Sequence, residues 1–246
     1  MEMLVVTGAS LLAGFVDSIV GGGGLVPALF AVFPGAPPAT LLGANKSASI
    51  WGTAAAAAQF SQRVQMRWGA LWPAAVLGFV GAMAGAWGVT VFPGDFLRRA
   101  LPAVLLYTLA RKDMGRLHAP RFTGHAETLA ACAIGLSIGL YDGFFGPGAG
   151  SFLVFLFVRW MGYDFLNASA SAKIINTLTN AAALILLAAK GHVWWHYGLV
   201  MAVANVAGSL LGTRVALKHG AGFVRVVFIV VVSALILKTA SDAFLR

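Results

Sequence analysis

Two short glycine-rich stretches decide the fold of this chain. The first reads Gly14-Phe15-Val16-Asp17-Ser18-Ile19-Val20-Gly21 and continues into Gly22-Gly23-Gly24. The second reads Gly139-Leu140-Tyr141-Asp142-Gly143-Phe144-Phe145-Gly146 and continues into Pro147-Gly148-Ala149-Gly150. Both place an aspartate inside a long apolar block, just before a run of glycines. In a membrane, a helix broken in this way survives only where its backbone faces protein or a cavity.

The two stretches belong to a longer internal duplication. Asp142 matches Asp17 at an offset of 125 residues, and Lys173 matches Lys46 at an offset of 127. The second offset also aligns two GxxxG pairs, Gly81 and Gly85 with Gly208 and Gly212. Four features in the same order at a nearly constant offset indicate a repeat.

The composition places both repeats in a membrane. Of the 246 residues, 59% are hydrophobic and 10% are charged, whereas a soluble domain carries about a quarter charged residues. A membrane span needs about 20 apolar residues. The apolar blocks cover approximately residues 4–33, 39–60, 68–92, 97–110, 129–161, 165–189, 194–217 and 223–243. We therefore predict an all-α polytopic membrane protein whose two related halves each hold about four hydrophobic segments.

The polar segment Arg111–Glu127 is the natural linker, and it divides the chain into a first membrane repeat, 1–118, and a second, 119–246. The first segment of each half is broken by its glycine-rich run. The N-terminus lacks the basic region of a signal peptide, so we expect the first block to be retained in a multi-pass membrane protein.

The charges of the chain favour lipid contact over nucleic acid. The net charge is +9, but the basic residues lie mostly between apolar blocks, where they orient the protein and meet anionic lipid. The single cysteine, Cys132, excludes an intramolecular disulfide and a cysteine-rich metal site. We expect no metal and no cofactor.

Two topologies agree with these blocks. If every block crosses once, the halves are parallel, and the connections place nine Lys and Arg residues on one side against six. If the first and fifth blocks are hairpins, each half has three crossings, the second half is inverted, and the count is ten against five. The positive-inside rule favours the hairpins, with both termini outside. The ten residues are Arg63, Arg67, Arg111, Lys112, Arg116, Arg121, Arg159, Arg214, Lys218 and Arg225.

Four ionisable residues lie well inside apolar blocks: Asp17, Lys46, Asp142 and Lys173. A charge at the centre of a membrane costs at least about 2.5 kcal/mol, so each needs a partner or a water-filled cavity. Two structural ion pairs would satisfy them, and so would a site for substrate and protons. Their symmetric duplication beside glycine runs favours the site.

The glycine runs suit an anion. A helix that restarts after a break presents free N–H groups and the positive end of its dipole. Close helix packing is the alternative use of these glycines. The glycines predicted to bind substrate are Gly22, Gly23, Gly24, Gly148 and Gly150.

A polar face surrounds each lysine. Lys173, Asn176, Thr177 and Asn180 follow the spacing i, i+3, i+4, i+7, which is one stripe of a helix. Such a stripe also serves to bond neighbouring helices, but a lysine among uncharged donors suits an oxyanion with several acceptor oxygens. The residues around Lys46 are Asn45, Ser47, Ser49 and Thr53, of which we predict Asn45 and Ser47 to bind substrate.

These motifs, with Asn45-Lys46-Ser47 and Ala172-Lys173 in the spans that follow them, resemble the sulfite exporter TauE/SafE family over nearly the whole chain. The resemblance implies a transporter of small sulfur-containing anions, such as sulfite or an organosulfonate, often by export across the bacterial inner membrane. The short fourth block, residues 97–110, departs from the pattern and leaves the exact number of spans open.

We therefore predict a secondary transporter for a small oxyanion, possessing no enzymatic activity. Lys46 and Lys173 would hold the anion, and Asp17 and Asp142 would balance them and carry a coupling proton. Asp142 is the favoured carrier because its aromatic neighbours make its surroundings less polar. An anion channel and a membrane-embedded enzyme are the alternatives, and the sequence holds no nucleophile-and-base arrangement for the latter. The expected partners are an inorganic or organosulfur anion and lipid, with a homo-oligomer left open.

Overall fold

The computed structural model describes residues 2–21, 25–92 and 122–244, with side chains as far as residue 234. All regular structure in this part of the chain is helical. The helices are α1 (Glu2–Val20), α2 (Leu25–Val32), α3 (Pro38–Ser61), α4 (Trp68–Val91), α6 (His125–Phe144), α7 (Ala149–Met161), α8 (Phe165–Ala189) and α9 (Trp195–Phe244). Helices α1, α4, α8 and the stretch Trp195–Ala234 are long and apolar enough to cross a membrane. The prediction of an all-α polytopic membrane protein is confirmed, while the fourth apolar block lies outside the described residues.

Both predicted helix breaks are present. Helix α1 ends next to Gly21, whose φ is 76°, and α6 is separated from α7 by a turn in which Gly146 and Gly148 have φ of 87° and 80°. These left-handed conformations are easily adopted only by glycine. The hydroxyl of Tyr141 donates to the carbonyl oxygen of Pro147 at 2.6 Å and ties the second turn to the end of α6.

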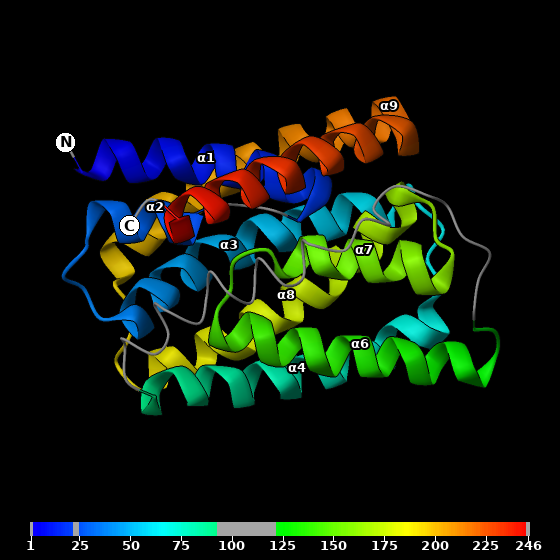
Figure 1. Ribbon diagram of the computed structural model, residues 1–246, viewed down its shortest axis with the longest axis horizontal. Coiled ribbons are helices and arrows are strands. Elements are labelled where there is room, and N and C mark those ends of the chain that lie inside the picture. Colours follow the sequence, from blue (N-terminus) through cyan, green and yellow to red (C-terminus); the bar gives the residue numbers. More distant parts are fainter. Residues whose placement is uncertain (1, 22–24, 93–121, 245–246) are drawn as a thin grey trace.

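Each broken segment returns to the end of the molecule from which it started (Figure 1). Phe33, directly after α2, contacts Trp194 and Tyr197 at the start of α9, in the same apolar cluster as Met3 of α1. The segment formed by α6 and α7 closes at the opposite end. There Glu127, at the start of α6, accepts hydrogen bonds from Arg67 and Tyr163 at 2.7 and 3.2 Å.

Because Tyr163 directly follows α7, the start of α6 and the end of α7 lie together. The two broken segments are therefore hairpins that enter from opposite ends of the bundle (Figure 1). The described helices thus have the arrangement of the second topology, in which the first and fifth apolar blocks are hairpins. A third reversal occurs within α9 at Gly220, whose φ of 73° and ψ of −169° separate two helical stretches.

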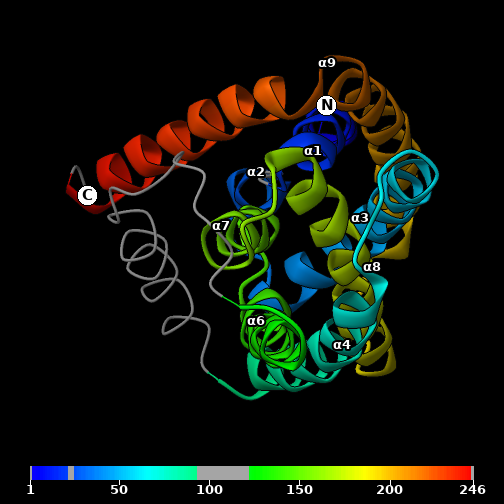
Figure 2. The same ribbon diagram turned by 90° about the vertical axis from the view of Figure 1, so that its right-hand side faces the viewer.

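Helices from distant parts of the sequence pack side by side. Helix α1 lies along α9, and α6 lies along α4 (Figure 2). Between these two layers, α3 and α8 pack on each other, while α3 also contacts α9 and α8 also contacts α4. The helices of residues 1–92 therefore contact mainly the helices of residues 122–244.

Glycines let these helices approach closely. A Cβ on Gly81 or Gly85 of α4 would overlap the backbone of α6, and one on Gly208 or Gly212 of α9 would overlap the backbone of α1. The two predicted GxxxG pairs thus lie in equivalent interfaces, α4 with α6 and α9 with α1. Small residues at such contacts are typical of membrane helix bundles, because they allow backbones to touch.

Candidate functional site

The two helix breaks meet and line one cavity. A Cβ on Gly21 would overlap the backbone of Gly150, and one on Gly150 would overlap Gly21, so only glycine fits at the crossing. The cavity holds about 450 Å³ of space not filled by atoms, and this volume includes the open solvent at its mouth. It is lined by Ala13, Asp17, Gly21, Leu25, Asn45, Lys46, Ser49, Thr53, Asp142, Gly146, Gly148, Ala149, Gly150, Asn176, Asn180 and Asn205.

The four buried ionisable residues form two crossed ion pairs. Lys46 of α3 lies 2.7 Å from an oxygen of Asp142 of α6. Lys173 of α8 lies 2.8 Å from an oxygen of Asp17 of α1. Each lysine therefore pairs with the aspartate that is distant in the sequence. Both lysines are at most 1% exposed, so without the carboxylates their charges would be very costly.

The pair of Lys46 and Asp142 is held by further hydrogen bonds. The ammonium of Lys46 also donates to Oδ1 of Asn180 at 2.8 Å. The second oxygen of Asp142 accepts a hydrogen bond from the hydroxyl of Thr179 at 2.6 Å. The amide nitrogen of Asn180 in turn lies 3.4 Å from the hydroxyl of Thr53 on α3. The network joins three helices.

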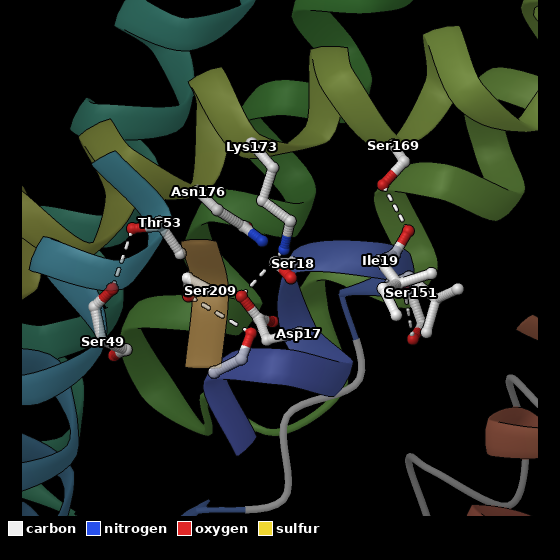
Figure 3. Close-up of polar contacts among 12 residues, drawn as sticks. Asp17, Ser18, Ile19, Ser49, Thr53, Ser151, Ser169, Lys173, Asn176 and Ser209 are labelled. Carbon is white, nitrogen blue, oxygen red and sulfur yellow. Dashed lines mark hydrogen bonds and ion pairs between the residues drawn. The ribbon is translucent and has the colours of Figure 1, made fainter. Parts of the chain in front are cut away.

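The pair of Lys173 and Asp17 has a more open environment. The side chain of Asp17 is 20% exposed, against 6% for Asp142. Figure 3 shows Lys173 and Asn176 reaching from α8 toward Asp17 at the end of α1. Asn176 lines the cavity and is 5% exposed.

Residues from the second part of the chain cap the end of α1. The hydroxyls of Ser169 and Ser151 donate to the carbonyl oxygens of Ile19 and Val20 at 2.6 and 3.2 Å (Figure 3). The backbone N–H of Ser151 donates to the carbonyl oxygen of Gly21 at 3.0 Å. These three bonds satisfy carbonyls that the helix end leaves unpaired, and they fix the position of α1 against α7 and α8.

Most of the predicted site residues come together here. The cavity is lined by Lys46, Asn45, Asn176, Asn180, Gly148, Gly150, Asp17 and Asp142. Lys173 reaches it through its bond to Asp17. Gly22, Gly23 and Gly24 lie outside the described residues.

Two predicted substrate-binding hydroxyls do not line the cavity. Ser47 donates to the carbonyl oxygen of Ala44 and packs against Gly198 of α9, because it lies one helix position away from Lys46. Thr177 donates to the carbonyl oxygen of Lys173, one turn earlier on its own helix. Serine and threonine often bond the preceding turn in this way when no other partner is near.

Sequence reasoning missed Asn205 and Thr179. Asn205 of α9 lines the cavity, is 3% exposed and donates to the carbonyl oxygen of Ser10 at 3.1 Å. An asparagine within the apolar block 194–217 was the available signal. Thr179 is next to Asn180, but nothing in the sequence shows that it contacts Asp142. Within the described residues, no group of three or more His, Cys, Asp or Glu residues could hold a metal ion.

Comparison with known proteins identifies this architecture. The model of the sulfite exporter TauE/SafE family matches residues 6–239. The chain belongs to the TauE/SafE family. TauE/SafE membership, together with the apolar helices, makes it a multi-pass membrane transporter, and an inner-membrane location is consistent with a bacterial transporter.

Several curated relatives match most of the chain. A probable membrane transporter protein of a Sinorhizobium species is 34% identical over 239 residues, which cover 95% of this chain and 90% of the relative. The probable membrane transporter protein YfcA of Escherichia coli is 36% identical over 241 residues, covering 95% and 88%. One from Haemophilus influenzae is 29% identical, covering 87% and 85%. No solved structure gives a significant match.

Proposed function

We propose that this protein is a secondary transporter that moves a small oxyanion, sulfite or an organosulfonate, across the bacterial inner membrane. One observation carries the proposal. Fully buried Lys46 lines a cavity of amide side chains and glycine backbone, and fully buried Lys173 is bonded to Asp17 in the lining of the same cavity. Ammonium and amide N–H groups are donors, and an oxyanion offers several acceptor oxygens to them. The family description, a sulfite exporter, agrees with this ligand chemistry.

We further propose that anion movement is linked to a proton. The net charge of the four buried residues Asp17, Lys46, Asp142 and Lys173 is zero when all are ionised. Each ion pair joins one positive and one negative charge. A bound monoanion would leave an uncompensated negative charge in a site of low dielectric constant, which is costly. Protonation of one aspartate cancels it, so proton and anion would each favour binding of the other.

The arrangement of the helices suits alternating access by two inverted repeats, for which we propose the boundaries 1–118 and 119–246. In such transporters the substrate site lies at the interface of the repeats, near discontinuous helices. Here both helix breaks line the cavity, and both ion pairs connect the two proposed repeats. A ligand that competes for the lysines would loosen contacts between the repeats, which links binding to their relative motion.

Flux measurements on the purified protein test the function. Proteoliposomes should take up one or more of sulfite, thiosulfate, sulfate and alkylsulfonates with saturable kinetics. Lys46→Ala and Lys173→Ala should each lower this flux at least about 10-fold, since a lost charged hydrogen bond costs about 1.5–3 kcal/mol. Lys190→Ala is the matched control, because Lys190 is exposed and its bond among the described residues is to Thr90, away from the cavity. Wild-type flux in both cavity variants would contradict the site.

The same preparation separates a transporter from an anion channel. An imposed pH gradient should drive the transported anion above its equilibrium concentration inside the vesicles. A channel of the same architecture would dissipate gradients and could not build one. Saturable uptake against the anion gradient therefore supports the transporter hypothesis. Flux that only runs down the gradient would support the channel instead.

A further inference from the structure

We propose that the two ion pairs have different tasks: Lys173 and Asn176 bind an oxygen of the anion, Asp17 takes up the coupling proton, and Lys46 with Asp142 forms a fixed brace. This inference rests on the proposed function. It changes the sequence-based preference, which favoured Asp142 as the proton carrier.

The donors of the two lysines are used to different extents. A lysine ammonium has three N–H donors. Lys46 directs two of them to Asp142 and Asn180. Lys173, which is 0% exposed, has Asp17 as its one acceptor among the described residues. Two donors of Lys173 are therefore left for a ligand or water in the cavity.

Asn176 supplies a second, independent indication of a ligand. Its side chain is 95% buried, and its Oδ1 has no hydrogen-bond partner in the part of the chain that the structure describes. It lies one helical turn beyond Lys173 and faces the cavity (Figure 3). A buried amide oxygen without a donor is costly, so Oδ1 requires a ligand or water that donates to it. The amide N–H groups of Asn176, which lie next to Gly150, are the donors that we assign to an anion oxygen that also meets Lys173.

The nearest backbone acceptors are already engaged. The carbonyl oxygens of Ile19, Val20 and Gly21 accept bonds from Ser169 and Ser151. These carbonyls lie at the same end of α1 as Asp17. Each already accepts a hydrogen bond from a serine, so none of them depends on Lys173 for a donor. The capped helix end also holds Asp17 in place, which keeps the site organised before the anion arrives.

The carboxylates differ in the same direction as the lysines. Both oxygens of Asp142 are bonded, one to Lys46 and one to Thr179. Among the described residues, one oxygen of Asp17 is bonded, and its side chain is more exposed. A proton can therefore reach Asp17 without breaking a second hydrogen bond. The charged groups that face Asp17 are Lys173 at 2.8 Å and, across the cavity, Lys46 and Asp142; α2, α7 and α9 bring no titratable side chain to its described lining.

Proton uptake on anion binding tests this division of tasks. Titration calorimetry with an alkylsulfonate, in buffers of different ionisation enthalpy, counts protons bound per anion. An alkylsulfonate stays ionised throughout, whereas sulfite takes up a proton of its own near neutral pH. Wild type should bind about one proton per anion near its pH midpoint. Asp17→Asn should bind the anion with almost no proton uptake. Asp142→Asn alone would add a positive charge that itself balances the anion, so the second pair is tested with the charge-neutral double variant Lys46→Met with Asp142→Leu, which should retain the uptake of wild type.

Two milder variants complete the test. Asn176→Leu should weaken anion binding about 10-fold without changing the proton count, because only a ligand contact is lost. Thr179→Val removes the second bond of Asp142 without changing the net charge, and it replaces the double variant if that protein does not fold. The pH midpoint of anion affinity should not move in Thr179→Val, whereas it would move if Asp142 carried the proton.

The remaining outcomes overturn one proposal or the other. Loss of proton uptake in the double variant Lys46→Met with Asp142→Leu, or its retention in Asp17→Asn, assigns the proton to Asp142 and removes the inference. Equal losses in both variants also remove it. A folded wild-type protein that binds none of the anions in the panel contradicts the proposed function itself. Anion binding by wild type therefore separates failure of the inference from failure of the function.

Discussion

At the scale of single residues, stability and function make opposite demands on the buried lysines. A charge that must bind an anion has to stay charged in the interior, and here each lysine does so beside a carboxylate. Removing one member of a buried pair costs about 3–5 kcal/mol, whereas replacing both by apolar residues is often neutral. The ion pairs can therefore be tested for stability and transport separately.

We expect Lys46→Met to lower the melting temperature of the detergent-solubilised protein, because Asp142 is left buried without its cation. The double variant Lys46→Met with Asp142→Leu should recover most of that loss but should not transport. Arg67→Ala provides the control, since the side chain of Arg67 is 54% exposed and exposed pairs contribute little. Transport by the recovered double variant would show that the pair is structural only.

Tyr163 gives a prediction for the dependence of stability on pH. Burial and the nearby Glu127 carboxylate raise the pKa of Tyr163 above its ordinary value of 10.0, while Arg67 acts in the opposite direction. The folded protein therefore holds this proton more tightly than the unfolded chain. The stabilisation is complete below pH 10.0 and is lost as the pH rises above it.

Thermal unfolding between about pH 8 and 11 should show this loss in wild type, and Tyr163→Phe should show less of it. The variant also loses the 3.2 Å bond to Glu127, so its stability at neutral pH should fall by about 0.5–1.5 kcal/mol. Identical alkaline slopes in both proteins would mean that Tyr163 does not contribute.

Part of the site could be predicted from single residues, and part could not. Asn176 and Asn180 lie on one helical stripe with Lys173, so their common position follows from the period of the helix. The crossed pairing of Lys46 with Asp142 does not follow, because it depends on how α3 and α6 meet in space. Thr179 was missed for the same reason, since its role depends on a neighbour on another helix.

At the scale of elements, glycine patterns carried the most information. They correctly placed the breaks after α1 and α6, because a left-handed turn needs glycine. The GxxxG pairs, used in the sequence only to align the repeats, lie at close helix contacts in the structure. Which helices make these contacts follows from the crossed packing of α1 with α9 and of α4 with α6, which no local pattern encodes.

Helix α4 offers a matched pair of glycines for a test. A Cβ on Gly81 would overlap the carbonyl oxygen of Leu136 in α6, whereas a Cβ on Gly69 would meet nothing within 4 Å. We expect Gly81→Ala to destabilise the protein by about 1–3 kcal/mol, since backbone cannot move aside as a side chain can. Gly69→Ala should melt as wild type does. Equal melting temperatures would mean that α4 and α6 separate easily.

At the scale of the whole molecule, the distribution of charge indicates the orientation. The end of the bundle where α4 and α6 begin carries Arg67 and Glu127. Five more basic residues lie near this end, next to α4, at the end of α7 and around the reversal at Gly220: Arg63, Arg159, Arg214, Lys218 and Arg225. At the opposite end, the described side chains include Lys190 after α8. The positive-inside rule therefore assigns the Arg67 end to the cytoplasm.

This orientation gives the last prediction, which concerns both ends of the chain. Helix α1 begins at the end opposite Arg67, and after Gly220 the second stretch of α9 runs back toward that same end (Figure 1). Both termini should then lie outside. A reporter that is active only in the cytoplasm should be silent when fused after Arg246, and alkaline phosphatase fused there should be active, because that enzyme needs the oxidising periplasm for its disulfides.

The same two reporters fused after Pro120, within the basic linker, should give the reverse pattern and serve as the control. In the hairpin topology one side of the membrane carries ten Lys and Arg residues and the other carries five. Reversing this difference should reverse the orientation of the protein. Replacing Arg63, Arg67 and Arg159 by glutamine removes three charges from the proposed cytoplasmic side and should yield a mixture of orientations. A cytoplasmic reporter that is active after Arg246 in the unaltered protein would place the C-terminus inside, and the hairpin orientation would then be wrong.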